Sequence, residues 1–111
     1  MNEYEPTKIY HALMDAGADY ADKRAAFCQL DDLTKSMLAD AYTEFKDGSA
    51  AEKKEKALAS DMYLSHLKGL AESRRAFLVA QVKYDSTKAY ADALRTKQST
   101  KRAEMNNLSG R

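Results

Sequence analysis

A short stretch near the middle of the chain, residues 47–52, carries signals that end one helix and begin another. Gly48 readily takes the left-handed conformation that follows a helix end. Ser49 and Glu52 have the spacing of a capping box, which starts a helix. Helix breakers are rare elsewhere, since the 111 residues include one Pro and four Gly. The sequence therefore predicts an all-α fold in which two long antiparallel helices turn back on each other.

Apolar residues recur at steps of three and four on both sides of this turn, as on one face of a helix. The prediction is a single helical-hairpin domain, residues 1–111, with a first helix over about 6–47, a turn at 48–49 and a second helix over about 50–106. A seven-residue spacing marks one line along each helix. These residues are the predicted hairpin core: Leu13, Tyr20, Phe27, Tyr63, Leu70, Phe77 and Tyr84.

A turn centred on Gly48 also fixes which residues face each other. It places Phe27 opposite Leu70. The neighbouring pairs in the same register are Tyr20 with Phe77 and Leu13 with Tyr84. Because the second helix is longer than the first, its basic end, about residues 88–111, is expected to extend past its partner. Gly17 and Gly69 indicate either a bend or a close contact.

Two helices bury only one stripe each, which makes a two-helix core marginal. We therefore expect a homodimer that completes a four-helix bundle. The alternative is a break at residues 85–87, after which the tail folds back as a third helix.

The composition places limits on the class of protein. Hydrophobic residues make up 44% and charged residues 32%, which is too apolar for a disordered chain. No apolar run approaches the ~20 residues of a membrane span. The acidic start of the chain lacks the apolar segment of a signal peptide, and the single Cys28 cannot form an internal disulfide. We expect a cytoplasmic protein with no membrane partner, and a buried or half-buried thiol.

Residues that support catalysis or metal binding are sparse. His11 and His66 have no further ligands at metal-site spacing and are interpreted as surface residues. The four glycines lie far apart, which excludes a phosphate-binding loop. Acid–base catalysis needs carboxylates in a desolvated cleft, and a hairpin offers a solvated face instead. The sequence predicts no enzyme activity, no catalytic or metal-binding residues and no cofactor.

The formal net charge of +1 conceals an uneven distribution. Residues 1–48 carry ten acidic and five basic side chains, whereas residues 88–111 carry two acidic and six basic ones. Such asymmetry indicates a partner of opposite charge, or contacts between the two ends within the hairpin or between copies. Two sets of residues are the candidate partner surfaces.

The first set is the basic end of the second helix, where cations recur with hydroxyl and amide groups and could follow phosphates. The candidate nucleic-acid-binding residues are Lys88, Tyr90, Arg95, Lys97, Lys101 and Arg102. Cations near a helix C-terminus are also favoured by the helix dipole alone. The second set is acidic and lies in the first helix. Its members are Asp15, Asp19, Asp22, Asp31, Asp32 and Asp40.

Three segments of the second helix carry a resemblance to known proteins: residues 57–63 (ALASDMY), 67–72 (LKGLAE) and above all 94–105 (LRTKQSTKRAEM). Together with the central Gly-Ser helix restart, they resemble a family of small helical proteins encoded in phages and prophages of proteobacteria. That family has no established activity, but its genes tend to lie near those for recombination, replication or single-strand annealing. The resemblance implies an accessory role in phage DNA metabolism or in defeating host defences.

The sequence thus predicts a non-catalytic phage accessory protein that binds a protein or DNA partner in recombination or replication. One alternative is an inhibitor of a host defence or nuclease complex, in which the acidic first helix occupies a basic groove. The other is a structural coiled-coil adaptor.

Overall fold

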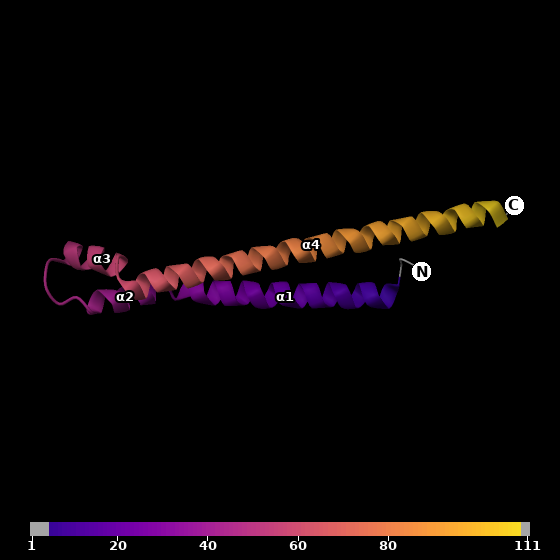
Figure 1. Cartoon of the computed structure of the whole chain (residues 1–111). Coiled ribbons are helices and arrows are strands. Elements are labelled where there is room, and N and C mark those ends of the chain that lie inside the picture. The colour runs from indigo at the N-terminus through magenta and orange to yellow at the C-terminus, as the bar shows by residue number, and fades with distance from the viewer. Residues whose placement is uncertain (1–4, 110–111) are drawn as a thin grey trace. The chain divides into compact units, whose positions relative to one another are not determined.

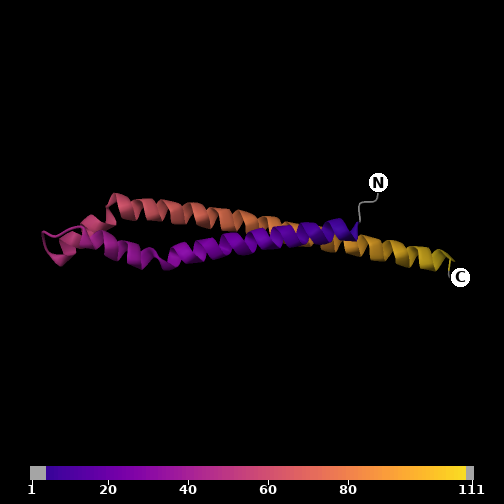
Figure 2. The same ribbon diagram turned by 90° about the horizontal axis from the view of Figure 1, so that it is seen from below.

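A computed structural model describes residues 5–109 of the chain and gives four helices (Figures 1 and 2). They are α1 (Pro6–Asp32), α2 (Thr34–Thr43), α3 (Ala50–Leu58) and α4 (Asp61–Ser109). No strand occurs among the described residues. The prediction of an all-α protein is therefore confirmed.

The chain forms two compact units. The first combines residues 5–20 with residues 79–109, and the second comprises Ala21–Leu78. Helices α1 and α4 contribute to both units, whereas α2, α3 and their connection belong to the second unit. Each unit is described by itself.

The connection between α2 and α3 uses the capping residues that the sequence indicates. Gly48 has a φ of +104°, a conformation that side chains other than glycine rarely adopt. The Ser49 hydroxyl accepts a hydrogen bond of 3.2 Å from the backbone N–H of Glu52. This bond satisfies one of the N–H groups that a helix start leaves without an internal partner, so α3 begins at Ala50.

The predicted first helix, about 6–47, is instead two helices. At Leu33 the backbone N–H bonds to the carbonyl of Leu30, three residues back, rather than four. The same tightening ends α2 at Thr43, where Glu44 and Phe45 donate to carbonyls three residues earlier. The prediction was wrong because these local turns satisfy the backbone with no glycine or proline to signal them.

The predicted second helix, about 50–106, is also interrupted. Ser60 accepts a hydrogen bond of 3.3 Å from the N–H of Tyr63 and donates one of 2.7 Å to the Ala57 carbonyl. One hydroxyl therefore closes α3 and caps α4. A serine followed by Asp61 in the first helical turn is an N-cap signal that the sequence analysis overlooked.

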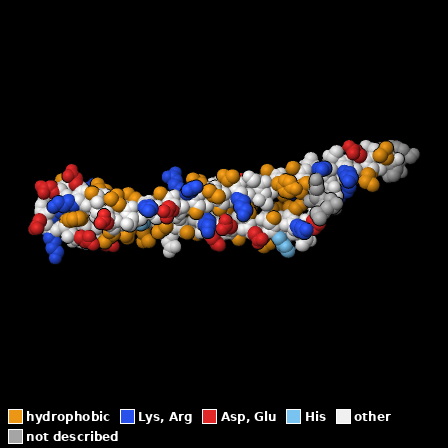
Figure 3. Space-filling view, viewed as in Figure 1, with side chains coloured by type: hydrophobic (Ala, Val, Ile, Leu, Met, Phe, Trp, Pro, Cys, Tyr) orange, Lys and Arg blue, Asp and Glu red, His pale blue; other side chains and the backbone are white. Residues whose placement is uncertain are grey.

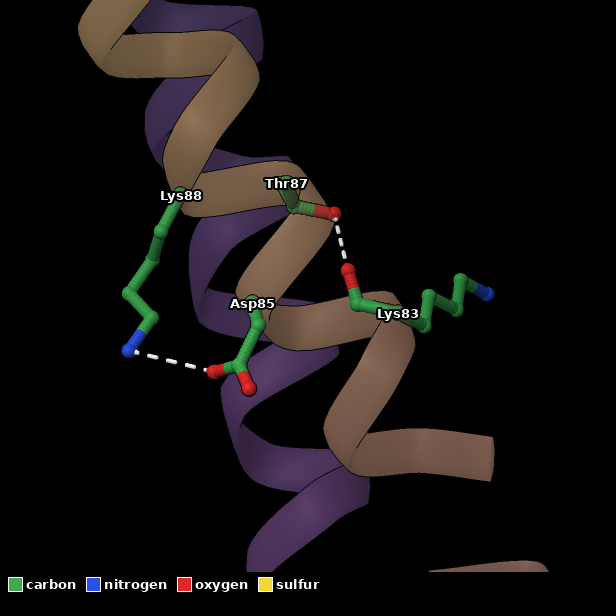
Figure 4. A network of polar contacts seen from close by, with 4 residues as sticks. All are labelled: Lys83, Asp85, Thr87 and Lys88. Atoms are coloured by element: carbon green, nitrogen blue, oxygen red, sulfur yellow. Dashed lines mark hydrogen bonds and ion pairs between the residues drawn. The ribbon is translucent and has the colours of Figure 1, made fainter. Parts of the chain in front are cut away.

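Beyond Ser60, α4 continues without interruption to Ser109. The alternative of a break at residues 85–87 is wrong. Thr87 donates a hydrogen bond of 2.7 Å to the Lys83 carbonyl, and Lys88 forms an ion pair of 3.4 Å with Asp85 (Figure 4). Both contacts lie within the helix and are compatible with its geometry. No third helix folds back among the described residues.

In the second unit, the buried cluster is Ala41, Ala57 and Tyr63, from α2, α3 and α4. Half-buried residues of α4 recur at steps of three and four, among them His66, Leu70, Ser73 and Phe77. Phe77 stacks on Phe27 of α1 with ring centroids 5.4 Å apart. His66 Nε2 lies 2.9 Å from the hydroxyl of Thr34, so this histidine is a half-buried interhelical residue and not the predicted surface one.

In the first unit, the segments of α1 and α4 lie side by side and antiparallel (Figures 1 and 2). Tyr20 stacks on Tyr84 with centroids 5.9 Å apart. The buried side chains of this unit are mostly alanines, which allow close helix approach. They are Ala16, Ala80, Ala91 and Leu94. Leu13, predicted in the core, is half-buried here.

The pairing of α1 with α4 is displaced from the predicted register by about four to seven residues. Phe27 stacks on Phe77, where Leu70 was the predicted partner. Tyr84, the predicted partner of Leu13, stacks on Tyr20 and lies against Gly17.

Next to the turn, Lys53 lies over the Tyr42 ring, close to the predicted register. The contact of Thr34 with His66 is displaced by about three residues, and that of Phe27 with Phe77 by seven. The offset therefore arises at two interruptions. One is at residues 59–60, where α4 does not continue the axis of α3 (Figure 1), and the other is at Leu33, between α1 and α2.

Among the described residues, no helix combines the length and apolar character needed to cross a membrane.

Gly17 and Gly69 provide a matched test of helix packing. A Cβ at Gly17 would lie 3.2 Å from the Tyr84 ring, whereas a Cβ at Gly69 would meet nothing within 4 Å. The expected close contact is thus confirmed at Gly17 and wrong at Gly69. Replacing a helical glycine by alanine gains up to about 1 kcal/mol. We expect Gly69→Ala to raise the free energy of unfolding by about that amount, and Gly17→Ala to gain less, because the ring must shift. Urea denaturation monitored by circular dichroism measures both, and equal gains would contradict this packing.

Candidate partner-binding surface

The basic residues of α4 begin with Lys88 and Arg95, which the structure partners with aspartates one turn earlier. Lys88 lies 3.4 Å from Asp85, and Arg95 lies 3.5 Å from Asp92. All four side chains are at least half exposed, so solvent weakens both pairs. The aspartates nevertheless reduce the local positive charge. Arg102 continues the same seven-residue spacing without an aspartate three residues before it.

Lys88 has a second contact that ties it to the packed side of α4. Its ammonium lies 4.5 Å from the centre of the Tyr84 ring, within the range of a cation–π interaction. Tyr84 is the ring that stacks on Tyr20 and sits over Gly17. Part of the role of Lys88 is therefore structural.

The predicted basic residues do not share one face of α4. Lys97 follows Lys88 by nine residues, which is about two and a half helical turns, and therefore lies on the opposite side. Lys101 lies four residues after Lys97 and Tyr90 lies seven residues before it, so all three share one side of α4. Tyr90 is 59% exposed. The cations surround the end of α4 instead of forming one row.

The part of α4 that extends past α1 is shorter than predicted. Ala91 and Leu94 are buried and Gln98 is half-buried, whereas every residue from 99 to 108 is exposed. The predicted extension over about 88–111 therefore begins near residue 99, and residues 110–111 lie outside the described part of the chain. The change in register is the cause, because it moves α1 further along α4.

Two apolar residues at this end were missed by the sequence analysis. Met105 and Leu108 are 60% and 86% exposed. They follow the buried Ala91 and Leu94 by two heptads each. That spacing was visible in the sequence, but the predicted line of core residues ended at Tyr84.

The six predicted aspartates are all exposed but do not form one acidic face. Asp15, Asp19 and Asp22 follow steps of four and three and share one side of α1. Asp31 lies nine residues after Asp22, or about two and a half turns, and thus on the other side. Asp32 and Asp40 also lie off the side that Asp15, Asp19 and Asp22 share. Asp32 lies one residue after Asp31, and Asp40 belongs to α2.

The second unit contains an open groove of about 530 Å³ between α2 and α3. Its lining contains no carboxylate, histidine or cysteine, and consists of Lys35, Leu38, Ala39, Tyr42, Thr43, Ala50, Lys54 and Ala57. Over the described residues, no group of three or more His, Cys, Asp or Glu side chains is placed to hold a metal ion. Cys28 is exposed, contrary to the expected burial, because it lies beside the stripe that contains Phe27.

Comparison with protein-family models, with curated proteins and with solved structures found no match to this chain. The resemblance to phage-encoded proteins remains a prediction from the sequence segments that carry it.

Proposed function

We propose that this chain is a non-catalytic accessory protein of phage recombination or replication, and that it binds a protein or DNA partner through the end of α4. The main supporting observation is that residues 99–108 are helical and exposed on every side. A helical segment that no other part of the described chain covers is available for a partner. The link to phage DNA metabolism rests on the resemblance of residues 94–105, which include this segment.

Charge supports a polyanionic partner such as DNA. Lys101 and Arg102 lie in the exposed segment, and neither forms an ion pair with a residue that the structure describes. Lys88 and Arg95, in contrast, are each next to an aspartate. Contact with phosphates would release counterions and thus depend on salt concentration.

The DNA interaction can be tested with two double variants that remove the same charge. In Lys101→Gln/Arg102→Gln, we expect the slope of log affinity against log salt to fall by about 1.4–1.8, for two lost phosphate contacts. Lys88→Gln/Arg95→Gln should change it less, because Asp85 and Asp92 already offset those cations. Fluorescence anisotropy with labelled single- and double-stranded DNA, at low and near-physiological salt, measures both.

Equal losses in the two variants would contradict this placement of the phosphate contacts. Absence of binding even at low salt would remove DNA as the partner and leave a protein. A chain that ends at Gln98 is the appropriate truncation, because it retains the buried Ala91 and Leu94.

We also propose that the two units together form a helical hairpin and that two copies associate as a four-helix bundle. Supporting this proposal, only small parts of each unit are buried, and eleven large apolar side chains among the described residues are more than 40% exposed. Tyr10, Met14, Leu64, Val79 and Val82 are examples. Burying such side chains against a second copy would stabilise the chain.

Sedimentation equilibrium tests the dimer directly. We expect a mass of twice 12.4 kDa at micromolar concentrations, with dissociation on dilution. A monomer throughout that range would contradict the proposed bundle.

The acidic first helix supports the alternative of a host-defence inhibitor, since Asp15, Asp19 and Asp22 are exposed on one side of α1. Replacing these three by asparagine should abolish inhibition of the host complex under that alternative. Under the leading proposal, the same change should leave partner binding by α4 intact. In a purely structural coiled-coil adaptor, replacing either set of charged residues would leave function unchanged. Replacing Phe27 or Phe77 would abolish it, because the helix packing would be lost.

A further inference from the structure

The packed side of α4 follows a regular heptad pattern in the first unit. Six of its buried and half-buried residues are separated by alternating steps of four and three, as in a coiled-coil seam. These six are Ala80, Tyr84, Thr87, Ala91, Leu94 and Gln98, and half-buried Gln81 lies beside the seam. The same steps lead next to Lys101, Met105 and Leu108, all of which lie within α4 and are exposed.

The seam therefore continues past the point where α1 begins. In this unit α1, which starts at Pro6, lies beside α4 (Figure 1). Tyr20 stacks on Tyr84, and a Cβ at Gly17 would lie 3.2 Å from the same ring. Leu108, at 86% exposure, and Met105, at 60%, occupy positions that are covered two heptads earlier. An apolar seam that continues an existing helix–helix interface suits a further helix of the same orientation as α1.

Charges around the seam indicate the character of that helix. Lys97 and Lys101 lie along it and Arg102 lies beside it, whereas Glu104 is the only acidic residue between 99 and 108. Figure 3 shows basic and apolar side chains next to each other at this end of α4. A second copy would bring the same cations together and be repelled, whereas an acidic helix would be attracted.

We propose that residues 98–108 of α4 dock an acidic amphipathic helix of a partner protein, antiparallel to α4 and continuing the seam that α1 forms. This inference rests on the proposed function, namely partner binding through the end of α4, and specifies the chemistry of the partner. Met105 and Leu108 supply the apolar contacts, and Lys101 and Arg102 pair with carboxylates on the flanks of the partner helix.

The test uses a synthetic peptide of about three heptads, with leucine at the two seam positions and glutamate on both flanks. The full-length chain, labelled with ¹⁵N, is titrated with this peptide and followed by two-dimensional NMR. We expect amide shift changes concentrated in residues 98–108. Met105→Ser/Leu108→Ser should weaken the affinity by about tenfold or more. Ala93→Ser/Ala103→Ser, a control at two exposed positions of α4 outside the seam, should leave it unchanged.

Three results would overturn the inference. One is equal binding of a peptide with lysine in place of glutamate. Another is shift changes located elsewhere, or unaffected by Met105→Ser/Leu108→Ser. The third is concentration-dependent shifts of residues 98–108 without peptide, which would assign the seam to a second copy.

DNA distinguishes failure of this inference from failure of the proposed function. If the chain binds DNA through Lys101 and Arg102 but not the acidic peptide, the helix-docking inference is wrong and partner binding at the end of α4 stands. If it binds neither DNA nor the peptide, the helix-docking inference is wrong and the proposed function loses DNA as its partner. Circular dichroism of each variant verifies that helix content is retained.

Discussion

The packing of α1 against α4 along one heptad seam is the interaction on which both units depend. Alanines at the buried positions of the seam, among them Ala16, Ala80 and Ala91, let the backbones approach closely. Aromatic rings then stack between the helices, Phe27 on Phe77 in one unit and Tyr20 on Tyr84 in the other. The absence of a side chain at Gly17 makes room for the Tyr84 ring. These contacts cover only a small part of each helix surface, so many large apolar side chains of the described residues stay exposed.

The register of this seam decides which part of α4 is exposed. Within the second unit, the Thr34 hydroxyl of α2 and His66 Nε2 of α4 lie 2.9 Å apart. A shift of α2 along α4 would leave the half-buried imidazole without that partner, which costs more than the bond itself contributes. The pair therefore favours one placement of α2 against α4. In the first unit, the register of the Tyr20–Tyr84 stack covers α4 through Gln98 and leaves residues 99–108 exposed, so that a packing preference defines the candidate binding surface.

Much of the fold followed from local patterns in the sequence. The helix restart after Gly48 depends on residues adjacent in the chain, and the seven-residue lines in α1 and α4 reflect helical geometry alone. The interruptions at Leu33 and at Ala59–Ser60 were missed, because a shift of one hydrogen bond or a single serine cap leaves a weak signal. The predicted register was therefore displaced by one to two turns, since it depends on how α3 joins α4 and how α1 joins α2. Consequently the basic residues were identified, but the boundary of the exposed end was misplaced and Met105 and Leu108 were overlooked.

The account of function depends on that register, because it places the end of the α1–α4 seam at Gln98. The most direct measurement is a ¹³C-edited nuclear Overhauser experiment on the full chain with labelled phenylalanine, of which there are three. The structure predicts cross-peaks between the rings of Phe27 and Phe77, whose centroids lie 5.4 Å apart. Cross-peaks from Phe27 to the methyl groups of Leu70, without contact to Phe77, would contradict the register and move the exposed segment of α4 toward residue 88.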